Sequence, residues 1–287
     1  MHKLSVIVPV GPEATNFFKM QKWVRESISL GVQVILVRDS FPDEKKIEFL
    51  STFHSEIDKK EIEVLDSTFK SPGLSRNLGL SLANGEWIIF WDCDDLPSPH
   101  NVLHEVSKAS ALEEVVIGQF QVNGIQTSTN SILDVAVNPG NWRIAYRKEF
   151  IGATRFAKNS WGEDQLFLVE IGLLTARAHF SSLVFYNYCV GLPTQLTNQK
   201  LHSTSLEGVI AASMKESQKI SKYKLGRIGM CIMILRMSLT FCSKSTGFVK
   251  LRAIQLFVMN NLRLIRMYKS DFVLAYFSLF VRVFRAK

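Results

Sequence analysis

The sequence has little cysteine, little proline and no run of low complexity. Its four cysteines, at positions 93, 189, 231 and 242, form no C-x-x-C pair and lack the spacing of a zinc finger. We therefore expect reduced thiols, as in a cytosolic protein. With 16 Gly, 8 Pro and 47% apolar residues in a chain of 287, the protein is neither collagen-like nor intrinsically disordered. The composition is that of a globular protein long enough to bury a core.

Long hydrophobic runs are also scarce. In the C-terminal part, apolar stretches such as 253–262 and 272–281 are interrupted by Lys or Arg about every ten residues. A membrane-spanning helix needs about 20 apolar residues, so these stretches are too short to cross a bilayer. The N-terminus passes from Lys3 directly into Leu4–Val10 without a small-residue cleavage site, so we expect no secretory signal.

Positive charge is concentrated towards the C-terminus. The formal net charge is +8, and of the 34 Lys and Arg, 15 lie in residues 213–287, which contain two of the 26 Asp and Glu. The residues before 213 carry more acidic than basic side chains. We therefore expect two regions of different character, an N-terminal domain over 1–205 and a basic helical region over 206–287.

Short apolar runs alternate with amphipathic stretches in the first hundred residues. This pattern is typical of βαβ units, and it predicts an α/β fold with a mostly parallel sheet flanked by helices. A Gly-containing pair, Asn84-Gly85, is expected to end the third helix. A further strand is expected at 115–125, and from about 207 onward the chain is expected to form helices. The expected strands are 4–10, 32–37, 62–65 and 87–91, and the expected helices are 17–30, 43–57 and 74–83.

Acidic residues follow two of these strands, Asp39 after the second and Asp92-Cys93-Asp94-Asp95 after the fourth. Ligands of open α/β sheets lie beyond the carboxyl ends of the strands, so both acidic positions are expected at one crevice. In an extended backbone, Asp92 and Asp94 point to the same side. Two such oxygen ligands suit Mg²⁺ or Mn²⁺ completed by substrate phosphates. A pair of this kind on its own is a weak signal, because acidic residues after a strand more often form a solvated turn.

Five ordered segments carry a resemblance. They are Leu-Ser-Val-Ile-Val-Pro-Val at 4–10, Ser-Pro-Gly-Leu-Ser-Arg-Asn-Leu-Gly at 71–79, Ala-Asn-Gly-Glu-Trp-Ile-Ile-Phe-Trp-Asp-Cys-Asp-Asp at 83–95, Gly-Glu-Asp-Gln at 162–165 and Lys-Leu-His-Ser-Thr-Ser at 200–205. In this order they resemble the first strand, the helix, the strand with its acidic cluster, the Gly-Glu-Asp motif and the basic-x-His-x-x-Ser segment of the family 2 inverting glycosyltransferases.

The resemblance implies a GT-A (Rossmann-like) fold that binds a nucleotide-diphosphate sugar, with UDP favoured by the habits of the family. Asp94 would ligate Mn²⁺ or Mg²⁺ together with the donor phosphates, and a bound cation neutralises charge on the leaving diphosphate. Arg76, in the first turn of a helix, suits an anion. The family's usual pair of acids after the second strand is Arg38-Asp39 here, and this departure leaves the base open. The implied nucleotide-sugar-binding residues are Pro9, Val10, Asp39, Gly73, Arg76, Asn77, Asp92 and Cys93.

The resemblance also implies the remaining roles. Asp164 would be the general base that takes the proton of the acceptor hydroxyl. Glu163, Asp95 and Trp161 would meet the acceptor or support the site, and His202 would contact a phosphate or add a metal ligand. Each has a plainer alternative: acids at a helix N-terminus for Glu163-Asp164, a solvated or core histidine for His202, and core packing for Trp161. Trp142 has the same two readings, as a sugar-stacking or a core residue.

The basic tail has two readings. On a helix of about 100° per residue, Arg252, Arg263 and Arg266 lie within roughly 60° of one another, with bulky apolar residues elsewhere around the helix. Such a helix suits an anionic membrane surface. The alternative is a helical subdomain that packs on the core or on a second subunit. We expect no nucleic-acid binding, because the basic residues are interleaved with apolar runs.

Together these features predict a metal-dependent, inverting glycosyltransferase that acts on a glycan or lipid-linked glycan. The resemblance implies the synthesis of a bacterial surface polysaccharide, such as capsule or O-antigen, by a cytoplasmic enzyme peripheral on the inner face of the cell membrane. The alternative is a membrane-associated binding protein that keeps the fold without turnover, and Arg38 is the one feature in its favour.

Overall fold

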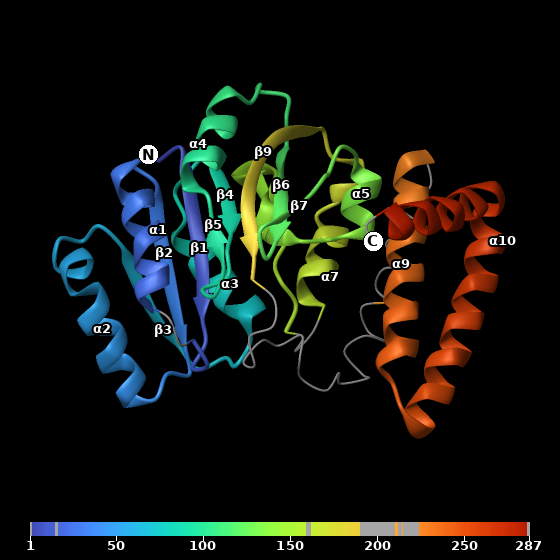
Figure 1. The fold of residues 1–287 in the computed structure, drawn as a ribbon, viewed down its shortest axis with the longest axis horizontal. Coiled ribbons are helices and arrows are strands. Elements are labelled where there is room, and N and C mark those ends of the chain that lie inside the picture. Colours follow the sequence, from blue (N-terminus) through green and yellow to red (C-terminus); the bar gives the residue numbers. More distant parts are fainter. Residues whose placement is uncertain are drawn as a thin grey trace. The chain divides into compact units, whose positions relative to one another are not determined.

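A computed structural model describes residues 2–14, 17–158, 162–189, 210–211, 214 and 224–285. The chain divides into two compact units (Figure 1). The first consists of Met1–Thr129, Asn141–Lys158 and Arg177–Asn198, and the second of Asn130–Gly140, Asn159–Ala176 and Gln199–Lys287. The second unit thus combines the basic tail with two short earlier segments.

The first unit contains the sheet and the helices that flank it. Its elements are β1 (Leu4–Val10), α1 (Phe17–Ser29), β2 (Gln33–Asp39), α2 (Asp43–Asp58), β3 (Glu63–Ser67), α3 (Pro72–Leu82), β4 (Trp87–Phe90), β5 (Leu96–Pro97), α4 (Pro99–Lys108), β6 (Val115–Val122), β7 (Ile125–Thr127), η1 (Asn141–Arg143), β8 (Ile144–Arg147), α6 (Lys148–Ile151) and β9 (Ala178–Tyr188).

Within the described residues, nine strands form one sheet. Eight follow the order β3-β2-β1-β4-β8-β6-β9-β5, and β7 pairs with β6. The first four strands are parallel, as the sequence predicts. Beyond them, β8 is antiparallel to both β4 and β6, whereas β6 and β9 are parallel. The α/β fold is therefore confirmed, with a sheet that is parallel in its first half and mixed in its second.

The two faces of the sheet are covered by different helices. Side chains alternate along a strand, so the even-numbered residues of β1 and β2 join the apolar cluster with α1, α2 and α4. The odd-numbered residues face α3. There Gly79 lies so close to β1 that a Cβ added to it would be 2.5 Å from Cγ2 of Ile7. This close approach fixes α3, and hence its first turn, against the ends of β1 and β2.

Three details differ from the predictions. Helix α3 ends at Leu82, and Gly85 is required because a Cβ there would lie 2.6 Å from the backbone nitrogen of Ser5. The strand expected at 115–125 is a hairpin, β6 and β7, because Asn123 and Gly124 both adopt positive φ angles in the turn. Helix α4 and strand β9 were not predicted. The Ser98-Pro99 start of α4 is a local sequence signal for a helix.

The second unit is helical in its described residues. It contains α5 (Ile132–Val137), α7 (Glu163–Glu170), η2 (Leu173–Thr175), α9 (Lys224–Lys244) and α10 (Gly247–Arg285), and α9 packs on α5, η2 and α10. Arg227 of α9 donates to Asp271 of α10 at 2.6 Å. Helix α10 is kinked at Lys269, where φ is 37° and ψ is −104°. The expected C-terminal helices are therefore present.

One described helix, Lys224–Ser243 within α9, is long and apolar enough to cross a membrane by length and composition alone. This stretch was not among the apolar runs considered from the sequence. However, 67% of its apolar window is buried inside the structure, which is the behaviour of a core helix. Its buried residues include Met230, Ile232 and Leu235. Length and composition therefore do not by themselves assign α9 to a bilayer.

Candidate donor-binding site

Asp39 at the end of β2 anchors the loop that leads into α3. Its carboxylate accepts hydrogen bonds from the backbone N–H groups of Lys70 (3.1 Å) and Ser71 (3.0 Å) and from the hydroxyls of Ser75 (3.1 Å) and Ser40 (3.0 Å). Burial alone would raise the pKa of Asp39, but these four hydrogen bonds offset it and hold the pKa below 3.8. Asp39 is thus a buried carboxylate whose oxygens already have partners, and its contact with a nucleotide stays a prediction.

Capping interactions fix the conformation of the first turn of α3. Ser71 is the N-cap, and its hydroxyl accepts a hydrogen bond from the N–H of Leu74 at 3.4 Å. Pro72 occupies the first helical position, and Gly73 is buried in the same turn. Ser40 and Lys70, which both donate hydrogen bonds to Asp39, have positive φ angles, which non-glycine residues seldom adopt. The Asp39 hydrogen bonds therefore hold a loop that the backbone alone would not favour.

Arg76, one turn into α3, contacts the acidic turn after β4. Its Nη2 lies 2.7 Å from Oδ1 of Asp92, and its guanidinium lies over the ring of Phe156, 5.4 Å from the centroid. Arg76 is buried, whereas the Asp92 side chain is about one-third exposed (31%). The structure thus brings together two of the predicted donor-site residues. It places a cation beside the carboxylate that would meet the donor.

Asp95 is fully buried below this turn. It accepts hydrogen bonds from the hydroxyl of Tyr186 (2.7 Å) and from the N–H of Cys189 (2.7 Å), both at the end of β9. Burial, and then the negative charges of Asp92 and Asp94, raise the pKa of Asp95 to about 8. The Tyr186 hydroxyl also accepts a hydrogen bond from the N–H of Asp92 at 3.1 Å. Asp95 therefore joins the turn to the end of β9 through hydrogen bonds.

Asp94 and Cys93 occupy the middle of the turn. Burial, reinforced by Asp94 and Asp92, raises the pKa of the Cys93 thiol far above its usual range. Cys93 is thus a spacer and not a nucleophile. Lys19 of α1 donates through Nζ to the backbone oxygen of Asp94 (3.1 Å) and to Sγ of Cys189 (3.2 Å). Its positive charge lies beside the turn, and no sequence motif pointed to it.

The remaining predicted donor residues line the strand ends. Pro9 and Val10 are buried at the carboxyl end of β1, opposite Val37 and Arg38 of β2. Asn77 exchanges two hydrogen bonds with the backbone of Phe156, each of 2.8 Å. Its amide therefore holds the segment around residue 156, and a nucleotide contact by Asn77 stays a prediction.

Arg38, the departure from the family pattern, faces away from Asp39. Its guanidinium makes two hydrogen bonds to the carboxylate of Asp66, the residue opposite it on β3, at 3.0 and 2.7 Å. It also lies over Phe49, 5.2 Å from the ring centroid. Arg38 thus ties β2 to β3 and to α2. This packing explains a cation at position 38 without reference to the base of a nucleotide.

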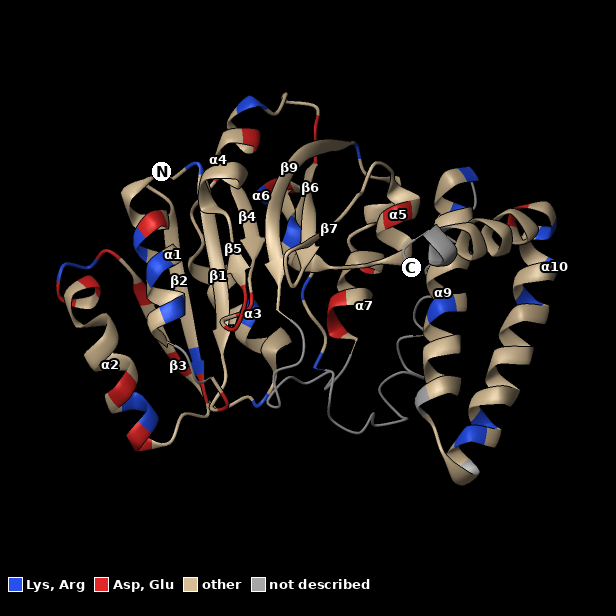
Figure 2. Ribbon diagram, in the orientation of Figure 1, with Lys and Arg blue, Asp and Glu red and all other residues tan. Residues whose placement is uncertain are grey.

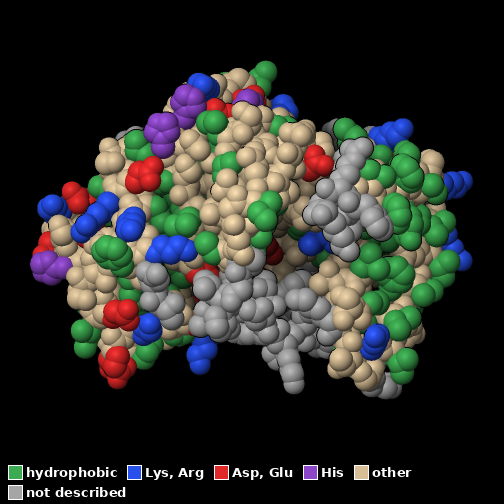
Figure 3. Space-filling view, in the orientation of Figure 1, with side chains coloured by type: hydrophobic (Ala, Val, Ile, Leu, Met, Phe, Trp, Pro, Cys, Tyr) green, Lys and Arg blue, Asp and Glu red, His purple; other side chains and the backbone are tan. Residues whose placement is uncertain are grey.

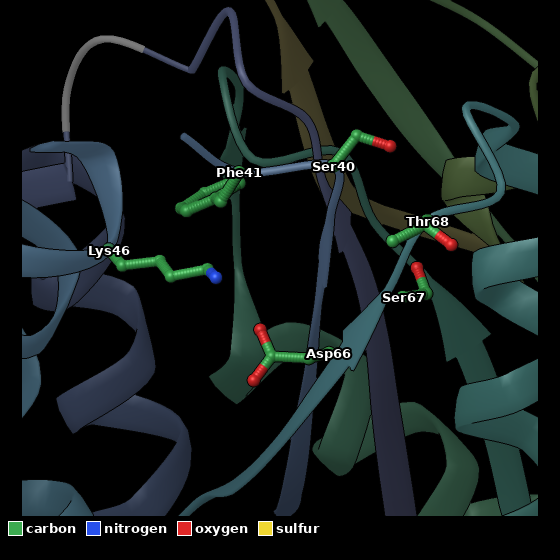
Figure 4. A pocket seen from close by; sticks show the side chains of 6 residues that line it. All are labelled: Ser40, Phe41, Lys46, Asp66, Ser67 and Thr68. Atoms are coloured by element: carbon green, nitrogen blue, oxygen red, sulfur yellow. The ribbon is translucent and has the colours of Figure 1, made fainter. Parts of the chain in front are cut away.

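A pocket of about 240 Å³ opens next to Asp66, at the carboxyl ends of β2 and β3 (Figure 4). The side chains of Lys46 and Asp66 face each other across it, with Phe41 at one wall and the hydroxyls of Ser67 and Thr68 at another. Ser67 Oγ is buried without a hydrogen-bond partner. The pocket adjoins the Asp39 site, because Ser40 both lines it and donates to Asp39. Its volume is below that of a complete ligand site, about 300 Å³ or more.

Trp142 packs within the first unit. Its ring stacks on Tyr186 at 4.5 Å and on Tyr188 at 5.7 Å between centroids. The half-buried indole joins the apolar cluster of the sheet. These contacts account for Trp142 as a packing residue, and they also buttress the tyrosine that supports Asp92 and Asp95.

Glu163 and Asp164 begin α7 in the second unit. Gly162 precedes them with a left-handed backbone (φ 78°), and Asp164 accepts a hydrogen bond from the N–H of Gln165 at 2.7 Å. Glu163 is buried and Asp164 is half-buried. Burial lowers the pKa of the Arg236 guanidinium on α9, and the carboxylate of Asp164 opposes that shift. The acids thus lie at a helix N-terminus, in line with their plainer alternative, and a buried cation of the same unit interacts with Asp164, while their catalytic roles stay predictions.

Only part of the predicted metal site lies within the described residues. Trp161 and His202 lie outside the described residues. Over the described ranges, no three His, Cys, Asp or Glu side chains gather to hold a metal ion by themselves. The donor chemistry nevertheless fits a hard cation, because three carboxylates crowd one turn and the charges of Asp92 and Asp94 help to raise the pKa of Asp95. Two carboxylates with substrate phosphates are a usual Mg²⁺ ligand set.

Comparisons with known proteins agree with this architecture. A model of "Glycosyl transferase family 2" matches residues 5–165. The chain is similar to S. aureus TarS 1–349 in complex with UDP-GlcNAc, with 16% identity, a TM-score of 0.67, and coverage of 99% of this chain and 92% of that one. It is also similar to the mannosyltransferase PcManGT from Pyrobaculum calidifontis in complex with GDP-Man and Mn²⁺. The identity is 13%, the TM-score is 0.53, and the match covers 99% of this chain and 86% of that one.

A further similar structure is glucosyl-3-phosphoglycerate synthase from Mycobacterium tuberculosis in complex with Mn²⁺, UDP and phosphoglyceric acid (14% identity, TM-score 0.50, 75% and 78% coverage). No curated protein matches the chain at a significant level. At these identities the solved structures establish the fold, and the family model covers more than half of the sequence. The chain belongs to glycosyl transferase family 2 and has the GT-A fold.

Proposed function

We propose that this protein is an inverting glycosyltransferase that moves a sugar from a UDP-sugar to a hydroxyl of a glycan or lipid-linked glycan. The observation that carries the proposal is the Arg76–Asp92 pair at the carboxyl end of β4, beside the capped start of α3. A buried guanidinium and a helix N-terminus both favour a diphosphate. The similar structures bind UDP-GlcNAc, GDP-Man or UDP, which supports a nucleotide-sugar donor.

The proposal includes a site for the base of the nucleotide. Since the oxygens of Asp39 accept four internal hydrogen bonds, we assign base and ribose contacts to its neighbours at the pocket, the hydroxyls of Ser40, Ser67 and Thr68. Ser67 Oγ, buried without a hydrogen-bond partner, is the group with most to gain from a ligand. Asp39 then acts by holding the 70–71 loop in place.

Asp94 and Asp92 are the residues that would hold Mn²⁺ or Mg²⁺, with His202 as a further candidate ligand. When bound, the cation supplies Lewis-acid neutralisation of the leaving diphosphate. The chain's own cations, Arg76 and Lys19, lie beside the same turn and would orient the donor phosphates. Two of the similar structures contain Mn²⁺, which supports a divalent cation.

Asp164 is our candidate general base, with Glu163 beside it to contact the acceptor. Inverting transfer requires a carboxylate that receives the acceptor proton, and such a base contributes roughly 10²–10⁴-fold in rate. The carboxylate of Asp164 interacts with the buried guanidinium of Arg236 in the same unit.

The alternative is a binding protein without turnover, and Arg38, the feature in its favour, is paired with Asp66. An Asp164→Asn variant separates the two hypotheses. An enzyme loses about 10²-fold or more of its transfer rate while nucleotide binding, measured by thermal shift, is retained. Glu170→Gln, an exposed acid at the other end of α7, is the matched control and should keep the rate. Equal transfer by Asp164→Asn and wild type would contradict the assignment.

The setting we propose is the synthesis of a bacterial surface polysaccharide, such as capsule or O-antigen, by a cytoplasmic enzyme peripheral on the inner face of the membrane. The sequence resemblance supports it, and UDP-GlcNAc in the TarS complex is compatible with it. The proton NMR spectrum of the product tests inversion, because an α-linked donor sugar must give a β-linked product.

A further inference from the structure

Helix α10 exposes an unusual amount of apolar surface. In its first arm, before the kink at Lys269, five of the exposed apolar side chains are Leu251, Ile254, Val258, Leu262 and Ile265, and Val249 and Met259 are exposed elsewhere around the helix. The spacing of the first five, three and four residues, places them on one face of the helix. Ala253, Leu264 and Tyr268 form the buried face instead. The exposed face is therefore a second apolar stripe, which the second unit leaves uncovered in the described residues.

The second arm, after the kink, repeats this arrangement. Asp271, Ala275 and Leu279 are buried at a spacing of four residues. Val273, Tyr276, Phe277 and Phe280 are spaced three and four residues apart and are exposed, Val273 by 65% and Phe277 by 66%. Scattered exposed apolar residues are normal on a protein surface, but an apolar stripe on each arm of one kinked helix marks an interaction surface. Figure 3 shows hydrophobic side chains gathered over α10.

Cationic side chains border the first stripe. At about 100° per residue, Arg252, Arg263 and Arg266 lie roughly 120° from the apolar stripe and on the solvent side of the helix. The one acidic residue of α10, Asp271, is buried and paired with Arg227. Figure 2 shows Lys and Arg along α9 and α10, in contrast to the mixed charges of α2. The exposed surface of α10 therefore combines apolar and purely positive side chains.

We infer that this surface of α10 docks on an anionic lipid bilayer, with the apolar stripes at the level of the acyl chains and the arginines at the headgroups. The positive charge of this surface favours an anionic bilayer over a second copy of the chain. A second copy of the chain in a two-fold contact would bring the same cationic stripes together, which is unfavourable, whereas anionic lipid complements them. Long Arg side chains reach the headgroups from beside a buried apolar stripe. The inference rests on α10 and not on the proposed transfer reaction.

Vesicle co-sedimentation of the full chain tests the inference. We expect binding to phosphatidylcholine vesicles that contain phosphatidylglycerol, weak binding to phosphatidylcholine alone, and loss of binding as salt rises. Arg263→Gln with Arg266→Gln should weaken partitioning by about fivefold for each cation removed. The matched control is Lys59→Gln with Lys108→Gln, two exposed cations of the first unit, and it should bind like wild type.

A second pair of variants addresses the apolar stripe. Val273→Ser with Phe277→Ser should lower partitioning by about tenfold or more, while Leu112→Ser, an exposed residue of the first unit, should not. Unchanged thermal melting shows that the variants fold. The inference is overturned if wild type stays in the supernatant with anionic vesicles. It is also overturned if wild type forms a dimer by light scattering that Val273→Ser with Phe277→Ser disrupts, without vesicle binding.

Discussion

Tyr186 donates its hydroxyl to Asp95 at 2.7 Å and accepts the N–H of Asp92 at 3.1 Å, so one phenol joins the two ends of the acidic turn. Tyr186 belongs to β9, which pairs with β6, far along the chain from the turn. The position of the carboxylates at the carboxyl end of β4 therefore depends on a strand that the local motif does not contain.

Tyr186→Phe should destabilise the protein by about 1–3 kcal/mol, because a buried carboxyl group and a backbone N–H each lose a partner. The ring and its stacking on Trp142 are retained, so the change isolates the hydroxyl. Urea unfolding measures the loss. Tyr276→Phe, at an exposed tyrosine, is the control and should unfold like wild type. Equal stability of Tyr186→Phe and wild type would show that the hydroxyl does not support the turn.

Asp39→Asn should cost about 1.5–3 kcal/mol at neutral pH, because an amide cannot accept the hydrogen bonds of both Lys70 and Ser71 as the carboxylate does. The folded-state pKa of Asp39 lies below 3.8, so the unfolded chain binds this proton more tightly. The contribution is fully present above about pH 4 and is lost as pH falls through the folded-state pKa.

The stability difference between wild type and Asp39→Asn should therefore shrink as pH falls below about 4. Urea unfolding at a series of pH values measures it, with Asp43→Asn, an exposed acid, as the control. A difference that stays constant down to pH 3, or a variant as stable as wild type at pH 7, would refute the anchoring role of Asp39.

Gly79→Ala should destabilise the protein by about 1–3 kcal/mol, since the new Cβ would lie 2.5 Å from Ile7 Cγ2 in a packed core. Because α3 carries Arg76, the variant should also bind the nucleotide more weakly. Ser81→Ala on the exposed side of α3 serves as the comparison. Thermal unfolding and nucleotide titration measure the two effects, and an unshifted melting temperature would mean that α3 can move off β1 without cost.

Lys19→Met should weaken the binding of UDP by a few-fold while leaving that of uridine unchanged, because Lys19 places its charge beside the Asp94 backbone. Isothermal titration of both ligands separates a phosphate effect from a base effect. The matched control is Lys22→Met, because Lys22 is also in α1 but its ammonium group lies over the ring of Phe18. Parallel losses for UDP and uridine would argue against a phosphate contact.

Local pattern was sufficient for the first half of the fold. The alternation of apolar runs and amphipathic stretches placed β1 to β4 and α1 to α3 within a few residues of their observed bounds, because these units form from neighbouring segments. Strand β9 was missed, because it pairs with β6 across more than fifty residues and its side chains are only partly buried. Long-range pairing of this kind leaves little local signal.

The candidate site shows the same division. The motif identified Arg76 and Asp92, which the structure joins in an ion pair. It did not reveal that the Asp39 carboxylate accepts hydrogen bonds from the 70–71 loop, or that Arg38 pairs with Asp66 on the neighbouring strand. Both contacts depend on how distant segments are placed in the fold. Tyr186 and Lys19 had no motif to mark them. Residues 161 and 202 lie outside the described ranges, so their roles stay predictions.

The most direct test of the account is the thermal stability of the protein with UDP, GDP, dTDP and CMP, each with and without Mn²⁺, for wild type and Asp94→Ala. A ligand that binds the folded state raises the melting temperature by linkage. The account predicts a metal-dependent rise for one nucleotide, UDP in our proposal, that is absent in Asp94→Ala. No rise with any nucleotide, or an equal rise in wild type and variant, would contradict a donor site at the acidic turn.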